Sequence, residues 1–191
     1  MKQSVQSIID SQIQDTGTVY INDLICRVND RVLSYDEALD VLAWANSFER
    51  IPAFLKLRDQ VKDPASYWRL LAGTYQMSDN LFQWRDEIRE CFLSEKPFRE
   101  QLMEQDEKQL LSSLPDHLTI YRGMTVTEAN SGNYGISWTL SREIAEFFAY
   151  EYWRNIDTNN EQKTVVSKQI RRDQIIALFN SRNEKEVIYI Q

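Results

Sequence analysis

The spacing of the hydrophobic residues changes near Pro115, and this change most constrains what the chain can fold into. Before Pro115, apolar residues recur at helical intervals, whereas after it short β-rich runs alternate with turns around a single expected helix. A length of 191 residues allows one domain, or a catalytic domain with a helical extension. We therefore expect an α+β protein with a helical N-terminal region at residues 1–115 and a β-rich core at residues 116–191, together forming one compact unit.

Capping signals mark the starts of helices in the first region. Residues 34–37 read S-x-x-E, the spacing of a capping box, and Asp63-Pro64 joins an N-cap residue to a proline at the first helical position. A third helix is expected to begin at Ser78 or Asp79. The aromatic residues of these helices lie at helical spacing, which is more typical of a core than of a ligand site; they are Tyr67, Trp68, Tyr75 and Trp84.

Short β-rich runs separated by turn residues dominate the second region. Ser141 is expected to cap the helix of this region, which runs through Ile144, Ala145 and Phe148. The runs predict strands at residues 118–121, 136–140, 165–170, 175–179 and 186–190, with a turn at 131–135 and a polar loop at 157–162.

The composition excludes several classes of protein. The 22 Lys and Arg residues against 29 Asp and Glu residues give a net charge of −7, which argues against binding to duplex nucleic acid and suits a partner that is a protein or a small ligand. No apolar run approaches the roughly 18 residues of a membrane helix, so we expect no membrane partner. The first residues contain one lysine and no apolar stretch, unlike a signal peptide, and we expect a cytoplasmic protein.

The two cysteines do not form a metal-binding pattern. Cys26 and Cys91 lie far apart, and His117 is the single histidine of the chain, so neither cysteine has a neighbouring ligand at zinc spacing. We expect two buried, reduced thiols and no metal.

Three short motifs in the second region contain residues suited to catalysis. They are Tyr121-Arg122-Gly123, then Ser137-Trp138-Thr139, and finally Glu184-Lys185-Glu186. Strand alternation would place both glutamates on one face, about 7 Å apart. Taken singly, each motif has an ordinary explanation: a surface ion pair for the arginine, a plain strand serine, and a solvated sheet edge for the glutamates.

In this order, the three motifs resemble the signature of the arginine-serine-glutamate class of mono-ADP-ribosyltransferases, which includes the clostridial binary toxins and vertebrate arginine-specific ecto-enzymes. That signature is an aromatic-Arg-Gly strand end, a Ser-Thr-Ser strand followed by a helix of A-x-x-F type (here Ala145 and Phe148), and E-x-E before the last strands. The resemblance covers residues 116–191, and residues 1–115 have no specific match. It implies an ADP-ribosyltransferase-like core of split antiparallel or mixed sheets with one main helix.

The middle of the serine motif departs from the family pattern. Trp138 replaces the threonine and Thr139 replaces the second serine, which still leaves two hydroxyl groups. On a strand, the side chain of Trp138 should face away from Ser137 and Thr139 and pack behind the site.

The resemblance implies that NAD is the substrate and assigns roles to four residues. Arg122 would hold the pyrophosphate, and the backbone of Gly123 would bond the nicotinamide amide. Glu186 would bond the ribose 2′-hydroxyl and stabilise the oxocarbenium-like ribose, with Ser137 orienting the carboxylate. No metal is needed for this reaction.

Further residues would complete the site. Glu184, two residues before the catalytic glutamate, marks transfer to an arginine of a target protein, which the loop at 180–183 would recognise. Thr139 would line the NAD site. Phe148 would stack on nicotinamide, or else belong to the core face of its helix, and Phe147 and Tyr134 are further candidates for stacking.

The function implied is transfer of ADP-ribose from NAD to a protein arginine, by an effector or toxin of a bacterium or phage. Three alternatives stay open: an NAD glycohydrolase, a catalytically silent module with the same fold that binds a partner protein, and a helical interaction domain with an unrelated β tail. The helical region could cover the NAD cleft, dock the target or complete the core.

Overall fold

The computed structural model describes residues 3–152 and 161–191, which form two units. The first unit ends at Leu102 and the second begins at Met103. This division falls earlier than the expected boundary at residue 115, because helix α7 (Gln105–Ser113) packs against strand β4 (Ala177–Phe179) and so belongs with the sheet.

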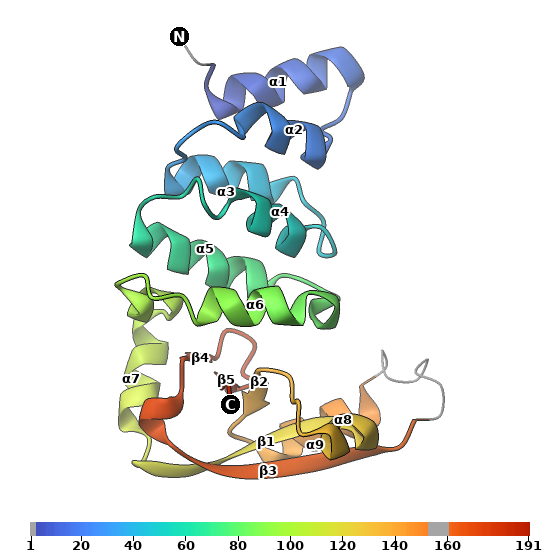
Figure 1. Cartoon of the computed structure of the whole chain (residues 1–191), viewed down its shortest axis with the longest axis vertical. Coiled ribbons are helices and arrows are strands. Elements are labelled where there is room, and N and C mark those ends of the chain that lie inside the picture. The colour runs from blue at the N-terminus through green and yellow to red at the C-terminus, as the bar shows by residue number, and fades with distance from the viewer. Residues whose placement is uncertain (1–2, 153–160) are drawn as a thin grey trace. The chain divides into compact units, whose positions relative to one another are not determined.

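The first unit is helical. Helix α1 contacts α2 and α3, α2 contacts α4, and α3 contacts α5, so the helices stack in chain order as Figure 1 shows. The short 3₁₀ helix η2 packs against α5. The elements are α1 (Val5–Thr16), α2 (Ile21–Val28), α3 (Tyr35–Ala43), α4 (Arg50–Leu57), α5 (Pro64–Gln76), η1 (Leu81–Trp84), α6 (Arg85–Phe92) and η2 (Arg99–Leu102).

Two of the three predicted helix starts are confirmed. The hydroxyl of Ser34 accepts from the N–H of Glu37, whose carboxylate accepts from the N–H of Ser34 at 3.0 Å. Asp63 caps α5, with a proline at its first position. The third start at Ser78 or Asp79 is wrong: Asn80, with a left-handed φ of 59°, precedes the 3₁₀ helix η1 at Leu81, and α6 follows from Arg85.

The aromatic residues of α5 form part of the core, as predicted. Tyr67, Trp68 and Tyr75 are all buried. The expectation of two buried thiols holds for Cys91 but is wrong for Cys26, which is exposed. The buried face of α2 is formed by Ile21, Leu24, Ile25 and Val28, and Cys26 lies outside this face.

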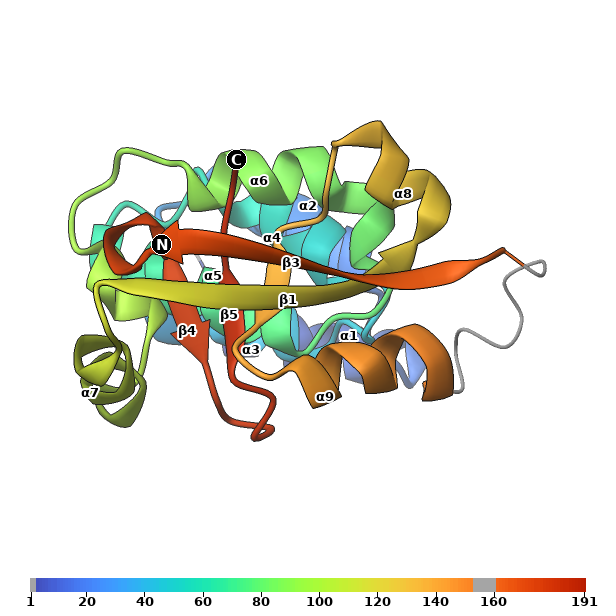
Figure 2. The same ribbon diagram turned by 90° about the horizontal axis from the view of Figure 1, so that it is seen from below.

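The second unit is built on one five-stranded antiparallel sheet with the order β3-β1-β2-β5-β4, which confirms the α+β class. Besides β4, its strands are β1 (His117–Thr125), β2 (Ser137–Thr139), β3 (Lys163–Arg171) and β5 (Glu186–Ile188). Strands β1 and β3 pair along their whole length, whereas β1 and β2 pair only at Tyr121 and Thr139. Figure 2 shows β1 and β3 running across the direction of β4 and β5.

The strand bounds differ from those expected. Strand β1 does not end at Tyr121, so Arg122 and Gly123 lie within it, opposite Val166 and Val165 of β3. Strand β3 is longer than the predicted run at 165–170, and β2, β4 and β5 are shorter than predicted. Within the polar loop expected at 157–162, residues 157–160 lie outside the described residues.

The second unit contains more helix than the single one expected after Pro115. Ser141 caps α9 (Arg142–Glu146) as predicted, and a π-helical turn, η3 (Phe147–Glu151), continues it. Helix α8 (Val126–Ser131) was not expected, because six residues are too few to display an apolar repeat. Gly132, in the expected turn, ends α8 with a left-handed φ of 68°.

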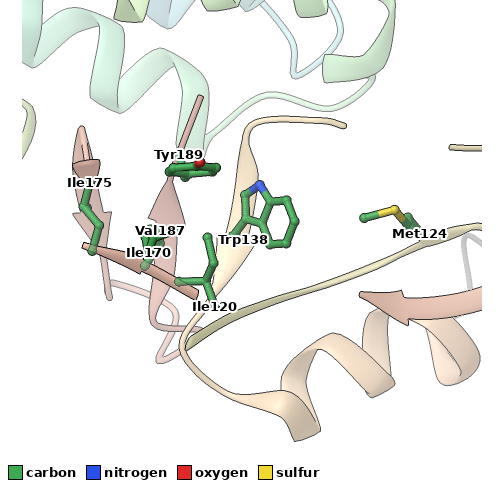
Figure 3. Packing of buried hydrophobic residues seen from close by; sticks show 7 residues of the cluster. All are labelled: Ile120, Met124, Trp138, Ile170, Ile175, Val187 and Tyr189. Atoms are coloured by element: carbon green, nitrogen blue, oxygen red, sulfur yellow. The ribbon is translucent and has the colours of Figure 1, made fainter. Parts of the chain in front are cut away.

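One hydrophobic cluster of the second unit lies on the face of the sheet that holds Trp138, and the opposite face is also buried at Ala177, Phe179 and Ile188. The indole of Trp138 packs edge-on against the rings of Tyr134 and Tyr189, with centroids 5.8 and 6.1 Å away. Figure 3 shows Trp138 beside Tyr189, with Ile120 and Val187 close by. The prediction that Trp138 packs behind Ser137 and Thr139 is confirmed. Among the described residues, no helix has the length and apolar character that crossing a membrane requires.

Candidate functional site

Ser137 and Glu186 meet across two neighbouring strands. In the antiparallel pair of β2 and β5, Ser137 lies opposite Ile188, and Thr139 lies opposite Glu186. Because directly paired residues point to the same face, Ser137, Thr139 and Glu186 share one face of the sheet. The Ser137 hydroxyl donates a hydrogen bond of 2.6 Å to Glu186 Oε1, and Glu186 is only 8% exposed. The structure therefore brings together a buried carboxylate and a hydroxyl that orients it.

Thr139 fixes the backbone around this pair. Its hydroxyl donates to the carbonyl oxygen of Glu184 at 2.7 Å and accepts from the N–H of Ser141 at 3.1 Å. The hydroxyl proton is thus used within the protein, between the E-x-E segment and the start of α9. In this arrangement the buried Thr139 holds the main chain at Glu184 and Ser141, and its hydroxyl does not donate to a ligand.

Arg122 reaches the same region from β1. Because Tyr121 pairs with Thr139, the side chain of Arg122 leaves β1 on the opposite face. Its Nη1 nevertheless reaches the carbonyl oxygen of Ser137 at 2.6 Å. Arg122 is thereby joined to the main chain of the residue whose hydroxyl holds Glu186.

Glu128 is a charged partner that sequence analysis did not find. Its Oε1 accepts from Arg122 Nε at 3.0 Å and lies 3.0 Å from Arg122 Nη2. The N–H of Gly135 donates to the same oxygen at 2.8 Å. The spacing T-x-x-E at 125–128 could have indicated a helix start at α8, but nothing in the sequence indicated the arginine as its partner.

Gly123 lies where a helix comes close to the sheet. A methyl group built on Gly123 would overlap the carbonyl oxygen of Ala145 and the nitrogen of Ala149, both main-chain atoms. Glycine is therefore required at this position by the close approach of α9 and η3 to β1.

The loop before Glu186 has a backbone that strand alternation cannot describe. Asn183 and Lys185 have left-handed φ values of 56° and 47°, and β5 begins only at Glu186. The expectation that alternation places Glu184 on the face of Glu186 is therefore wrong, because Glu184 lies outside the strand. Its carboxylate instead lies 3.3 Å from Arg182 Nη2, in a pair that is partly exposed to solvent.

Glu107 ties this loop to α7 and was also missed from sequence. One of its carboxylate oxygens accepts from the N–H of Asn180 at 2.7 Å, and the other accepts from the N–H of Glu104 at 2.9 Å. Glu107 is 4% exposed. A glutamate in a polar helix gave no sign of burial, and its partner Asn180 lies far along the sequence. The loop that carries Glu184 thus begins at a buried anchor.

The aromatic candidates fall into two separate groups. Phe148 is half-buried in η3, with ring centroids 5.5 Å from Phe147 and 5.2 Å from Tyr152. Single π-helical turns are frequent at functional sites. Tyr134 instead packs on Trp138, and its hydroxyl donates to the carbonyl of Ala129, in the core on the other face of the sheet.

Local hydrogen bonds shift the pKa of charged groups on α9. The hydroxyl of Ser141 donates to Glu143 and holds the pKa of that carboxyl below its ordinary value. A hydrogen bond to Glu146 raises the pKa of Arg142. Within the described ranges 3–152 and 161–191, His, Cys, Asp and Glu do not form a group of three that could hold a metal ion.

Comparisons with protein-family models, with curated proteins and with solved structures found no match for this chain.

Proposed function

We propose that this chain is an NAD-dependent mono-ADP-ribosyltransferase, which transfers ADP-ribose from NAD to an arginine side chain of a target protein and releases nicotinamide. The hydrogen bond from Ser137 to the buried carboxylate of Glu186 carries the proposal. It joins two of the three motifs by direct contact, and Arg122, from the remaining motif, bonds the Ser137 carbonyl.

The topology also supports this proposal. A strand pair, β1 with β3, meets the other strands through a single pair of residues and runs across β4 and β5, as Figure 2 shows. This arrangement is compatible with the split sheet that the resemblance implies, and in this chain the serine strand β2 and the glutamate strand β5 are paired.

The first step would break the bond between ribose C1′ and the nicotinamide nitrogen of NAD. The electron pair of that bond leaves with nicotinamide, and a positive charge develops over C1′ and the ring oxygen. In our proposal, Glu186 accepts a hydrogen bond from the ribose 2′-hydroxyl, which strengthens as this charge develops. Ser137 keeps the carboxylate oriented for it.

Binding of NAD would depend on Arg122. A guanidinium is planar, always charged, and suited to the oxygens of a pyrophosphate. The contacts of Arg122 with Ser137 and Glu128 restrict its rotation, so less conformational freedom is lost when the ligand binds.

Completion of transfer requires an acceptor nitrogen and a group that takes its proton. A nitrogen of the target arginine forms the new bond to C1′, and in our proposal Glu184 accepts the proton. Glu184 pairs with the guanidinium of Arg182, which is the kind of contact that we propose for the target arginine. The incoming arginine would replace Arg182 as its partner.

The same pairing favours NAD hydrolysis as a second candidate function. While Arg182 pairs with Glu184, a target arginine would have to displace Arg182, whereas a water molecule could attack C1′ without that contact and release its proton to solvent. Hydrolysis and transfer would thus share their first step and differ in their dependence on Glu184.

The test is incubation of the purified protein with labelled NAD and a cell extract, following both labelled protein and free nicotinamide. We expect a discrete labelled protein, no product with Glu186→Gln, and loss of the protein label but not of nicotinamide release with Glu184→Gln. Glu90→Gln, an exposed change on α6, is the matched control. Nicotinamide release without label would select hydrolysis, and no product at all would refute both functions.

A further inference from the structure

Glu128 accepts hydrogen bonds from N–H groups of two other segments of the second unit. Its Oε1 accepts from Arg122 Nε at 3.0 Å and from the N–H of Gly135 at 2.8 Å, and it lies 3.0 Å from Arg122 Nη2. The side chains of Arg122 and Glu128 are 20% and 18% exposed, so the pair is mostly screened from water. Charge-assisted hydrogen bonds of this kind hold their geometry more firmly than exposed ion pairs.

The carboxylate of Glu128 is turned away from its usual local partner. In a T-x-x-E capping box the glutamate reaches back to the N–H of the capping residue. Glu37 does so toward Ser34 in the same chain. At α8, Thr125 accepts from the N–H of Glu128 at 3.0 Å, but the Glu128 side chain contacts Arg122 and Gly135 instead. The short helix α8 thus serves to present this carboxylate to the arginine.

Two further contacts fix the guanidinium of Arg122. Nη1 donates to the carbonyl oxygen of Ser137 at 2.6 Å. A methyl group built on Gly135 would overlap Nη2 and Cζ of Arg122, so the guanidinium lies directly against the main chain there. These contacts set the plane and direction of the group, and Nη1 and Nη2 each have a second N–H group.

We propose that Glu128 is a positioning residue, which holds Arg122 so that its remaining N–H groups meet the pyrophosphate of a dinucleotide. The inference rests on the proposed function, because that function supplies NAD as the ligand. Glu128 also places a negative charge next to Arg122, which weakens the attraction for an anion. Loss of orientation should weaken NAD binding when Glu128 is changed, whereas loss of the negative charge should strengthen it. We expect the loss of orientation to have the larger effect.

The experiment compares the wild-type protein with Glu128→Gln, Glu128→Asp and Glu128→Ala in steady-state release of nicotinamide. Glutamine keeps an oxygen that can accept from Arg122 and Gly135, so KM for NAD should stay within about threefold. Aspartate keeps the charge but is too short to reach Arg122 and Gly135, and alanine has neither the charge nor an acceptor oxygen. Both should raise KM about tenfold with little change in kcat, because pyrophosphate contacts act alike on ground and transition states.

Two controls separate positioning from a general structural effect. Asp173→Ala removes a carboxylate from an exposed pair with Arg171 in the same unit and should leave KM unchanged. In NMR spectra of arginine labelled with ¹⁵N, the Nε–H signal of Arg122, identified by its loss in Arg122→Lys, should persist with glutamine and shift with alanine. Melting temperatures show whether each variant is folded. If Glu128→Ala does not fold, Glu128→Asp replaces it in the comparison of KM values.

Three results would count against the inference. Unchanged KM in the aspartate and alanine variants would overturn positioning and leave the proposed function standing. Tighter NAD binding by both the glutamine and alanine variants would show that Glu128 competes with phosphate. A wild-type protein that neither binds NAD nor releases nicotinamide would overturn the proposed function itself, and with it the ligand named here.

Discussion

Replacement of Ser137 by alanine removes the hydroxyl that donates to the carboxylate of Glu186 at 2.6 Å. This hydrogen bond joins a hydroxyl to a charged and buried acceptor, and such bonds contribute about 1.5–3 kcal/mol. If that energy is realised in the transition state, the conversion of about 1.4 kcal/mol per tenfold in rate gives a fall in kcat of about 10- to 150-fold. KM for NAD should change little, because the ground state depends less on the orientation of Glu186.

The assay is nicotinamide release over a range of NAD concentrations, with the melting temperature of each variant as a measure of folding. Ser167→Ala, an exposed serine on β3, is the matched control and should behave as the wild type. Because Ser137 is argued to act through Glu186, the double variant with Glu186→Gln should be no slower than Glu186→Gln alone. A folded Ser137→Ala protein with kcat within threefold of the wild type would refute the orienting role.

Three further predictions concern stability, measured by urea or thermal unfolding. Hydrogen bonds from Ser66 hold the pKa of Asp63 below its ordinary value, so the stability that they provide is present above about pH 4 and is lost as pH falls through the folded-state pKa. The difference in stability between the wild type and Asp63→Asn should therefore shrink in acid, and a difference that stays constant with pH would contradict this. Glu107→Ala should lower the free energy of unfolding by about 1–3 kcal/mol for each N–H left without an acceptor, those of Asn180 and Glu104. Unchanged stability would contradict the role of Glu107 in holding the loop. Gly123→Ala should destabilise by about 1–3 kcal/mol through overlap with main-chain atoms, whereas Gly73→Ala, with open space around it, should not; equal effects would refute the packing argument.

Local signals in the sequence predicted local structure well. The caps at Ser34 and Asp63 depend on residues three positions away, so the motif contains the whole interaction. Strand alternation likewise predicted that Trp138 turns away from Ser137 and Thr139. Where the backbone leaves regular structure, as at Asn80 and in the loop at 183–185, the same reasoning failed, because a residue with positive φ breaks the repeat.

The contacts that complete the candidate site could not be read from sequence. Glu107 bonds the N–H of Asn180, which is 73 residues away, and only the folded sheet brings the two together. Glu128 lies within six residues of Arg122, yet its spacing predicts a helix cap rather than an ion pair. In both cases the choice of partner depends on tertiary structure, since the carboxylate has more than one possible donor.

The role of Glu186 in cleaving NAD is tested most directly by comparing nicotinamide release by the wild-type protein and by Glu186→Gln, with the melting temperature of each protein measured in parallel. We expect measurable release by the wild type and a loss of at least about a hundredfold in the variant, since in our proposal Glu186 stabilises the charge that develops on ribose. Equal release by both proteins, or none by a folded wild type that also fails to bind NAD, would contradict it.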